Sequence, residues 1–473
     1  MKNAINLKNS AALIVGACIA LSTANVYASE DVKVLLEILL EKGVITQEEF
    51  DKKLKKAAEA QEIKEFNQAQ DIRKASQAIE QRAEAEKKFK TQFYGQVSAG
   101  FYQASKMTSL NTDVSGMSDQ PKGNNRIGFK ASRELDSDNS AMVTLESNFS
   151  ARTGAIGADS AGYGVARSSF TSVFDREANV RWISKPYGTL ILGRGPNLQN
   201  DLSSAFDSRQ NWNFGGLKPI GRYVGSHSAA GINRADRLIR YISPVWNGFN
   251  LDMGYSNSGI PNNEEKGNSF YFGGRYKNGD FEMGYNHADV RLSPATAPNT
   301  ILPLNNRLDF LAAKYTMNKL TINAGYIITR NPAATTTVNS TIGGTFNTNN
   351  TGGKVDANTI FGGAVYRFSS EISWNGGYYN VQDKTAQTAS NKNNDVRMFA
   401  TGLTWTPYKD IDLFVDYVKA MREDGATGVF TIYDKWVPDT GVGNLCTSST
   451  ANIACSESKK SQSGISIGAQ YKF

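Results

Sequence analysis

The chain has 473 residues, of which 40% are hydrophobic, and its formal net charge is +7. A mean hydropathy of -0.42 argues against a helical membrane protein, which needs several apolar runs of about 20 residues, and the small basic excess argues against nucleic-acid binding. Glycine (43), tyrosine (20) and phenylalanine (23) are abundant and proline (12) is scarce, as expected for many strands joined by tight turns.

Residues 1–28 predict an export signal. Lys2 and Lys8 precede the apolar stretch AALIVGACIAL, and small residues surround a cleavage point after Ala28. Lipoprotein cleavage before Cys18 is the alternative, but the longer apolar region and the well-placed Ala28 favour the ordinary signal. We therefore expect the mature chain to leave the cytoplasm.

Residues 29–91 predict a periplasmic helical extension. This segment is rich in Glu, Lys, Ala and Gln, lacks proline and has a single glycine, Gly43. The sequence TQEE, starting at Thr46, is a capping box that predicts the start of a second helix. Ile72 and Ile79 are one heptad apart, but the heptad is not sustained, so a coiled coil and a solvated helical spacer both remain open.

The pattern changes to a period of two in residues 92–473. The stretch FYGQVSAGFY places Phe93, Val97 and Phe101 on one face, with polar or small residues on the other. The C-terminal SGISIGAQYKF alternates in the same way from Ile465 to Phe473. Such alternation predicts strands with one apolar and one polar face.

Sixteen segments with this alternation follow one another to the end of the chain. Each is close to the roughly 9 to 11 residues that a tilted strand needs to cross a bilayer. The segments are 93–104, 124–134, 140–150, 174–184, 187–195, 235–243, 248–256, 268–277, 280–290, 306–317, 320–330, 358–368, 371–381, 394–406, 410–421 and 463–473.

The connections between these segments favour a membrane barrel over a soluble β-protein. Short turns such as KPYG, KNGD and TPYKD fall after every second strand, and long polar stretches, including 151–173, 196–234, 331–357 and 422–462, lie between them. Short turns on one rim and long loops on the other are typical of an outer-membrane barrel. In lipid the last strand must close against the first, which places Phe473 in the aromatic girdle.

With these features the chain resembles the trimeric general porins of proteobacterial outer membranes. The residues that carry the resemblance are YGQVSAG, NNRIGFKASREL, FDREANVRW followed by PYGTLILGR, ADRLIRYISPVWNGFNLDMGYS and the terminal GAQYKF. The resemblance implies an all-β fold, a 16-stranded antiparallel transmembrane β-barrel, here with an N-terminal α-helical extension. It also implies a homotrimer with an inward-folded third loop, and passive diffusion of small hydrophilic solutes and ions without a cofactor.

The expected location is the bacterial outer membrane, with the helices in the periplasm. Implied partners are outer-membrane lipids, lipopolysaccharide and the barrel-assembly machinery, which would recognise Phe473; no nucleic acid is expected.

Matched motif by motif, the resemblance implies wall arginines at the constriction and an acidic side on the folded loop, about 196–233. The wall residues are Arg126, Arg176 and Arg234, and the loop residues are Asp201 and Asp207. The loop lacks a clear family acidic signature. The helical extension looks more like the periplasmic extensions of some substrate-selective trimeric porins.

Strand parity assigns directions to charged side chains independently of the resemblance. The apolar residues around Arg126 are odd-numbered, so Arg126 and Lys130 face the lumen, and Glu146 falls on the polar face of its own strand. An Arg or Lys facing lipid at the midplane costs roughly 2 to 4 kcal/mol, which makes parity a strong filter. Arg176 and Arg181 have opposite parity: if Arg176 faces the pore, Arg181 faces outward, and the sequence leaves this open.

The functional interpretation of these charges is a transverse field that orients dipolar solutes and sets ion preference. The alternative is that they are ordinary hydrated residues of a wide pore. The basic excess of the chain predicts a slight preference for anions.

Cys446 and Cys455 are a close pair in an exported chain and predict a disulfide, with two free thiols as the alternative. No metal cluster or phosphate-binding loop is evident, since GRGPNLQ lacks the lysine that a phosphate-binding loop requires.

Other function classes remain as rivals. An enzyme is disfavoured because only His227 and His287 could serve as a histidine base, and parity puts His287 on the apolar outer face. A surface adhesin or cell-wall tether that uses the barrel as an anchor, and a substrate-selective channel, stay as alternatives to a general pore.

Overall fold

The computed structural model describes residues 32–87, 89–105, 113–151, 154, 156, 173–210, 212–224, 234–257, 268–292, 304–331, 355–384, 395–422 and 461–473. The chain divides into two compact units, Met1–Lys88 and Phe89–Phe473. Within the described residues, no helix combines the length and the apolar character that a membrane span requires. The predicted signal at 1–28 lies outside the described residues.

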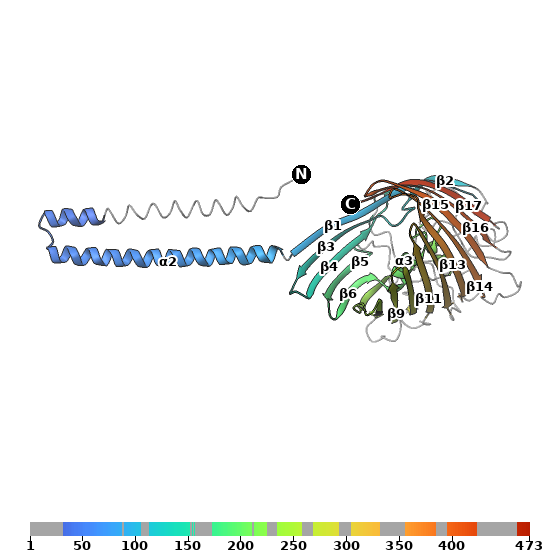
Figure 1. The fold of residues 1–473 in the computed structure, drawn as a ribbon, viewed down its shortest axis with the longest axis horizontal. Helices are drawn as coiled ribbons and strands as arrows, with labels where there is room; N and C mark the ends of the chain where they lie inside the picture. Colours follow the sequence, from blue (N-terminus) through green and yellow to red (C-terminus); the bar gives the residue numbers. More distant parts are fainter. Residues whose placement is uncertain are drawn as a thin grey trace, which may run out of the picture. The chain divides into compact units, whose positions relative to one another are not determined.

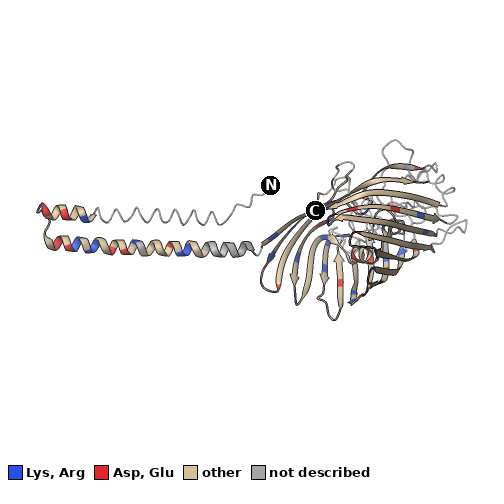
Figure 2. Cartoon of the chain, turned by 45° about the horizontal axis from the view of Figure 1, so that its top comes forward, with Lys and Arg blue, Asp and Glu red and all other residues tan. Residues whose placement is uncertain are grey.

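The first unit is helical. Residues 32–41 form one helix, and α2 (Gln47–Lys87) is a second helix of 41 residues, so the helical extension is confirmed. The Thr46 hydroxyl accepts from the Glu49 N–H (3.3 Å) and the Glu49 carboxylate accepts from the Thr46 N–H (3.0 Å), which is the predicted capping box. Acidic and basic residues are interspersed along the coloured part of α2 (Figure 2).

The second unit is one antiparallel sheet that closes on itself (Figure 1). β1 pairs with β17 from Gln96↔Lys472 to Ala104↔Gly464, so the last strand seals the first as predicted. The strands are β1 (Phe89–Ala104), β2 (Val114–Asp119), β3 (Arg126–Glu134), β4 (Asn139–Asn148), β5 (Glu177–Ser184), β6 (Gly188–Pro196), β7 (Arg234–Ile242), β8 (Phe249–Ser256), β9 (Ser269–Asn278), β10 (Phe281–Leu292), β11 (Leu304–Met317), β12 (Leu320–Asn331), β13 (Val355–Arg367), β14 (Ile372–Asp383), β15 (Val396–Tyr408), β16 (Ile411–Arg422) and β17 (Ser461–Lys472).

Sixteen of these strands match the predicted segments, and β2 is the addition. β1 is long enough to have two neighbours on the same side: residues 89–96 pair with β3, and residues 99–104 pair with β2. β2 and β3 therefore share one place in the ring, and the barrel has sixteen places, as predicted.

Alternation along the strands separates an apolar outer face from a polar inner face. Phe93, Phe101 and Ile467 point outward and are more than half exposed, whereas Ser98 is fully buried on the inner side. At the chain end, the backbone of Phe473 exchanges hydrogen bonds with Gly95, and its ring lies 5.9 Å from that of Phe93.

The connection between β6 and β7 contains two helices, α3 (Leu198–Phe206) and α4 (Leu217–Val224). Figure 1 shows α3 inside the ring, where it contacts β9–β12, and α4 contacts β14. Leu202 and Phe206 of α3 belong to a buried apolar cluster with Phe310 of β11. Gly284 of β10 allows this approach, since a Cβ there would lie 2.5 Å from the Leu202 side chain. The apolar core of the unit thus lies inside the barrel, between the loop and the wall.

Candidate functional site

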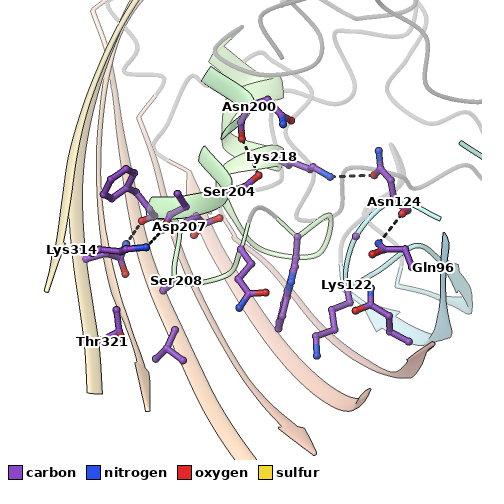
Figure 3. A pocket seen from close by; sticks show the side chains of 18 of the residues that line it. Gln96, Lys122, Asn124, Asn200, Ser204, Asp207, Ser208, Lys218, Lys314 and Thr321 are labelled. Atoms are coloured by element: carbon purple, nitrogen blue, oxygen red, sulfur yellow. Dashed lines mark hydrogen bonds between the residues drawn. The ribbon is translucent and has the colours of Figure 1, made fainter. Parts of the chain in front are cut away.

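The candidate site is a lumenal cavity of about 650 Å³ between the barrel wall and the folded-in segments (Figure 3). Its lining combines wall residues, residues of α3 and its neighbours, and the connection between β2 and β3. Eight basic side chains line it: Lys122, Arg126, Arg176, Lys218, Arg234, Lys314, Arg367 and Lys472. The acidic side chains in the described lining are Asp207 and Glu282.

Glu146 organises the basic wall at β3–β5. Its carboxylate accepts from Arg176 Nε, lies 3.7 Å from Arg126 Nε and accepts from the Tyr94 hydroxyl at 2.9 Å. Glu146 and Arg176 are buried, whereas the Arg126 side chain is 35% exposed. One carboxylate is therefore shared between two guanidinium groups that line the cavity.

The structure shows which way the Arg176 and Arg181 side chains face. Arg176 lies in a bend that ends just before β5, so the alternation of the strand does not apply to it. In β5 itself, Val180 and Trp182 are exposed on the outer face, and Arg181 pairs with Glu177 (2.5 Å) on the inner face. The conditional expectation that Arg181 would face outward if Arg176 faces the pore is wrong, because the bend resets the register.

A second shared carboxylate, Asp412 of β16, was not found from the sequence. Asp412 lies 3.2 Å from both Lys122 Nζ and Lys472 Nζ. Lys122 comes from the connection between β2 and β3, and its ammonium also lies 4.9 Å from the Trp212 ring centroid. A single lysine in the loop sequence QPKGNN gives no signal of this role, because its partner Asp412 is 290 residues away in the chain.

Asp207 lines the cavity but is used as an anchor of the loop. Its carboxylate accepts from the Tyr379 hydroxyl (2.5 Å), the Arg209 N–H (3.1 Å) and the Leu217 N–H (3.0 Å). Next to it, Arg209 is fully buried and pairs with the buried Asp416 of β16 (2.8 Å). These contacts fix the loop to β14 and β16.

Asp201 faces the wall instead of the cavity. Its carboxylate lies 2.6 Å from the Arg240 guanidinium, which also binds Asp252 at 2.5 Å. Burial alone would raise the pKa of Asp201, but Arg240 outweighs this effect and holds the pKa below its usual range. The structure therefore does not bring Asp201 to the cavity with Arg126 and Arg176.

The remaining predicted site residues divide between the lumen and positions that are not described. Arg234, the first residue of β7, is buried and lines the cavity. Lys130 also faces the lumen but is not part of the cavity lining; its ammonium lies 4.5 Å from the Tyr94 ring centroid. Cys446 and Cys455 lie outside the described residues. Among those described, no group of three or more potential metal ligands occurs.

Comparison with known proteins decides the family. The sequence model of the Gram-negative porin family matches residues 66–425. The chain belongs to the Gram-negative porin family. It is an outer-membrane porin channel, and this family and fold point to a channel rather than to an enzyme. A comparison with curated protein sequences found no match.

Solved structures of outer-membrane proteins share the fold at low sequence identity. The anion-selective porin from Comamonas acidovorans has a TM-score of 0.62 and 15% identity, covering 81% of this chain and 100% of that chain. OmpF of Salmonella typhi in complex with daunomycin has a TM-score of 0.52 and 16% identity; the match covers 82% of this chain and 98% of the OmpF chain. The trimer form of OmpT, an outer membrane protein of Vibrio cholerae, has a TM-score of 0.52 and 15% identity; the match covers 81% of this chain and 99% of the OmpT chain.

Proposed function

We propose that this porin is a water-filled channel for passive diffusion of small hydrophilic solutes and that it prefers anions. The observation that carries the proposal is the lining of the cavity, where eight basic side chains meet two acidic ones among the described residues. Fixed charges of one sign around a narrow, water-filled bore with low-dielectric walls raise the local concentration of ions of the opposite sign.

Basic side chains outnumber carboxylates in the cavity wall even after ion pairs are counted, because two carboxylates are each shared by two basic side chains. Glu146 serves both Arg126 and Arg176, and Asp412 serves both Lys122 and Lys472. Among the described residues, each of these two groups therefore has two basic side chains for one carboxylate. Lys218 adds a further ammonium, which donates to the side-chain oxygens of two asparagines.

The constriction in this proposal is built by two segments. The loop with α3 and α4 is the first, and the connection between β2 and β3 is the second. The two segments are hydrogen-bonded to each other: the Asn213 side-chain amide donates to the Gln120 carbonyl (2.6 Å), and the Phe214 N–H donates to the Pro121 carbonyl (3.2 Å). We infer that solutes pass between this double element and the basic wall.

The same proposal includes a homotrimer, a cleaved signal at 1–28, a barrel domain at 92–473 and periplasmic helices at 29–91. The trimer form of the similar OmpT structure supports the first of these. Lipopolysaccharide contact and recognition of Phe473 by the assembly machinery belong to the proposal as well.

The test is the zero-current potential of the protein in a planar bilayer under a potassium chloride gradient. We expect its sign to show that chloride is more permeant than potassium. The double variant Arg126→Gln/Lys218→Gln should reduce this preference, whereas Lys90→Gln/Lys185→Gln, which removes two exposed charges at the short-turn rim, should not. A cation-preferring wild-type pore would overturn the proposal.

A further inference from the structure

The side of the cavity that α3 forms carries hydrogen-bonding groups without charge. Asn200 and Ser204 are four residues apart on α3, so they lie on one face of the helix, and both line the cavity (Figure 3). The Ser204 hydroxyl donates to the Asn200 backbone carbonyl at 2.9 Å, which leaves the lone pairs of its oxygen able to accept. Ser204 is exposed, as is Gln210, which also lines the cavity. This face can therefore bind the hydroxyl groups of a solute.

The carboxylates near this face are engaged by the protein itself. Asp201 pairs with Arg240 of the wall, and Asp207 accepts three hydrogen bonds, as described above. Glu282, the other acidic residue of the described lining, lies 3.0 and 3.1 Å from two lysine ammonium groups. Because each carboxylate is already in contact with a cation or with donors, it repels an anion in the cavity less than an unpaired carboxylate would.

The apolar side chains in the described lining offer little surface to a solute. Phe206 and Trp212 are only 1% and 5% exposed. A lysine ammonium lies over each ring, 5.5 and 4.9 Å from its centroid. Ala205 and Val365 are small and only partly exposed. A fatty or aromatic acid would therefore gain little from burial here, whereas a solute rich in hydroxyl groups would find donors and acceptors.

Basic groups line the same cavity. Arg126 is 35% exposed and is the more exposed of the two arginines around Glu146. The Lys218 ammonium donates to the side-chain oxygens of Asn124 (3.2 Å) and Asn213 (3.0 Å). Asn124 is two residues before Arg126 in the chain, so the two basic side chains belong to one part of the lining. A carboxylate or phosphate there can accept charge-assisted hydrogen bonds.

We propose that the cavity binds hydroxylated organic anions, with the anionic group at Arg126 and Lys218 and the hydroxyl groups at Asn200 and Ser204. Sugar acids and sugar phosphates have this chemistry. The cavity volume of about 650 Å³ lies within the range of about 300–1,000 Å³ that is usual for small-molecule sites. This inference rests on the proposed function, an anion-preferring channel, and adds the class of solute that the channel favours.

The test is block of the chloride current through single channels in a planar bilayer. Gluconate carries one carboxylate and a hydroxyl on every other carbon, hexanoate has the same carbon number without hydroxyls, and sorbitol is a polyol without charge. We expect the half-blocking concentration of gluconate to be about fivefold or more below that of hexanoate, since one net hydrogen bond contributes about this factor in affinity. Sorbitol at the same concentrations should not block.

Variants separate the two halves of the site. In Asn200→Ala/Ser204→Ala the ratio of the hexanoate to the gluconate half-blocking concentration should fall to about one, because the groups that bind hydroxyls are gone. Arg126→Gln/Lys218→Gln should weaken block by both anions. The matched control is Ser132→Ala: Ser132 has the lumenal parity of Arg126 but is not part of the cavity lining, so the ratio should stay as in the wild type.

The outcomes distinguish failure of this inference from failure of the proposed function. A wild-type ratio near one, an unchanged ratio in Asn200→Ala/Ser204→Ala, or equal block by sorbitol and gluconate would overturn the inference, even in a pore whose zero-current potential shows anion preference. A cation-preferring wild-type pore would overturn the proposed function and this inference with it. Glucose 6-phosphate, measured in the same way, tells a sugar phosphate from a sugar acid by the lower of the two half-blocking concentrations.

Discussion

The pair of Arg209 and Asp416 gives the sharpest prediction about the folded-in loop. Both side chains are almost completely buried (0% and 1% exposed) and lie 2.8 Å apart. Arg209 also donates to the carbonyl groups of Gly215 (2.9 Å) and Phe214 (3.2 Å). Arg209→Met removes these bonds and leaves a buried carboxylate without its cation. Breaking a buried pair in this way costs about 3–5 kcal/mol.

The assay is equilibrium unfolding by urea in lipid vesicles, with single-channel recording of the same variants. We expect Arg209→Met to lower the free energy of unfolding by about 3–5 kcal/mol and to make the open-channel current noisy, since the loop loses its anchor. Arg209→Met/Asp416→Asn should recover much of the loss, because no uncompensated charge remains buried.

The matched control is Lys90→Met. Lys90 pairs with Glu134 at 2.7 Å, but both side chains are more than half exposed. Such a pair contributes about 0–1 kcal/mol. If Arg209→Met were as stable and as quiet as the control, the conclusion that this pair anchors the loop would be refuted.

Three further predictions concern other contacts. Asp201→Asn should destabilise the protein at neutral pH, and its stability should equal that of the wild type in acid. Arg240 lowers the pKa of Asp201 in the folded protein. The ion pair therefore stabilises the fold above the unfolded-state pKa of about 3.9, and this stabilisation is lost as the pH falls through the folded-state pKa. A pH-independent difference in unfolding would contradict this. Gly284→Ala should cost about 1–3 kcal/mol in urea unfolding by overpacking against α3, and a neutral effect would show that the helix is not held against the wall. Tyr94→Phe should cost about 1.5–3 kcal/mol in the same assay by removing a hydrogen bond to the Glu146 carboxylate, and wild-type stability would argue against that bond.

The sequence predicts the ring itself well because strand alternation is a local signal. An apolar outer face must meet lipid along every strand, so Phe93, Phe101 and Ile467 mark their strands without knowledge of their neighbours. β2 lacks this signal: VSGMSD is short and carries few apolar residues, and it is held by pairing with the distal half of β1.

The site is less predictable because its geometry depends on residues that are distant in the chain. Arg126 and Glu146 could be assigned to the inner face from parity alone. Parity fails at Arg176, where a bend precedes the strand. Asp201 and Asp207 look alike in the loop sequence, and only their partners on the wall show that each is held in an anchoring contact.

The central claim is that the closed ring of strands surrounds an open, water-filled bore despite its folded-in loop. Stepwise conductance in a planar lipid bilayer tests this claim most directly. We expect discrete current steps that scale with the salt concentration when the purified protein is added. Insertion into the bilayer without any current would contradict the claim and would leave the barrel as a membrane anchor.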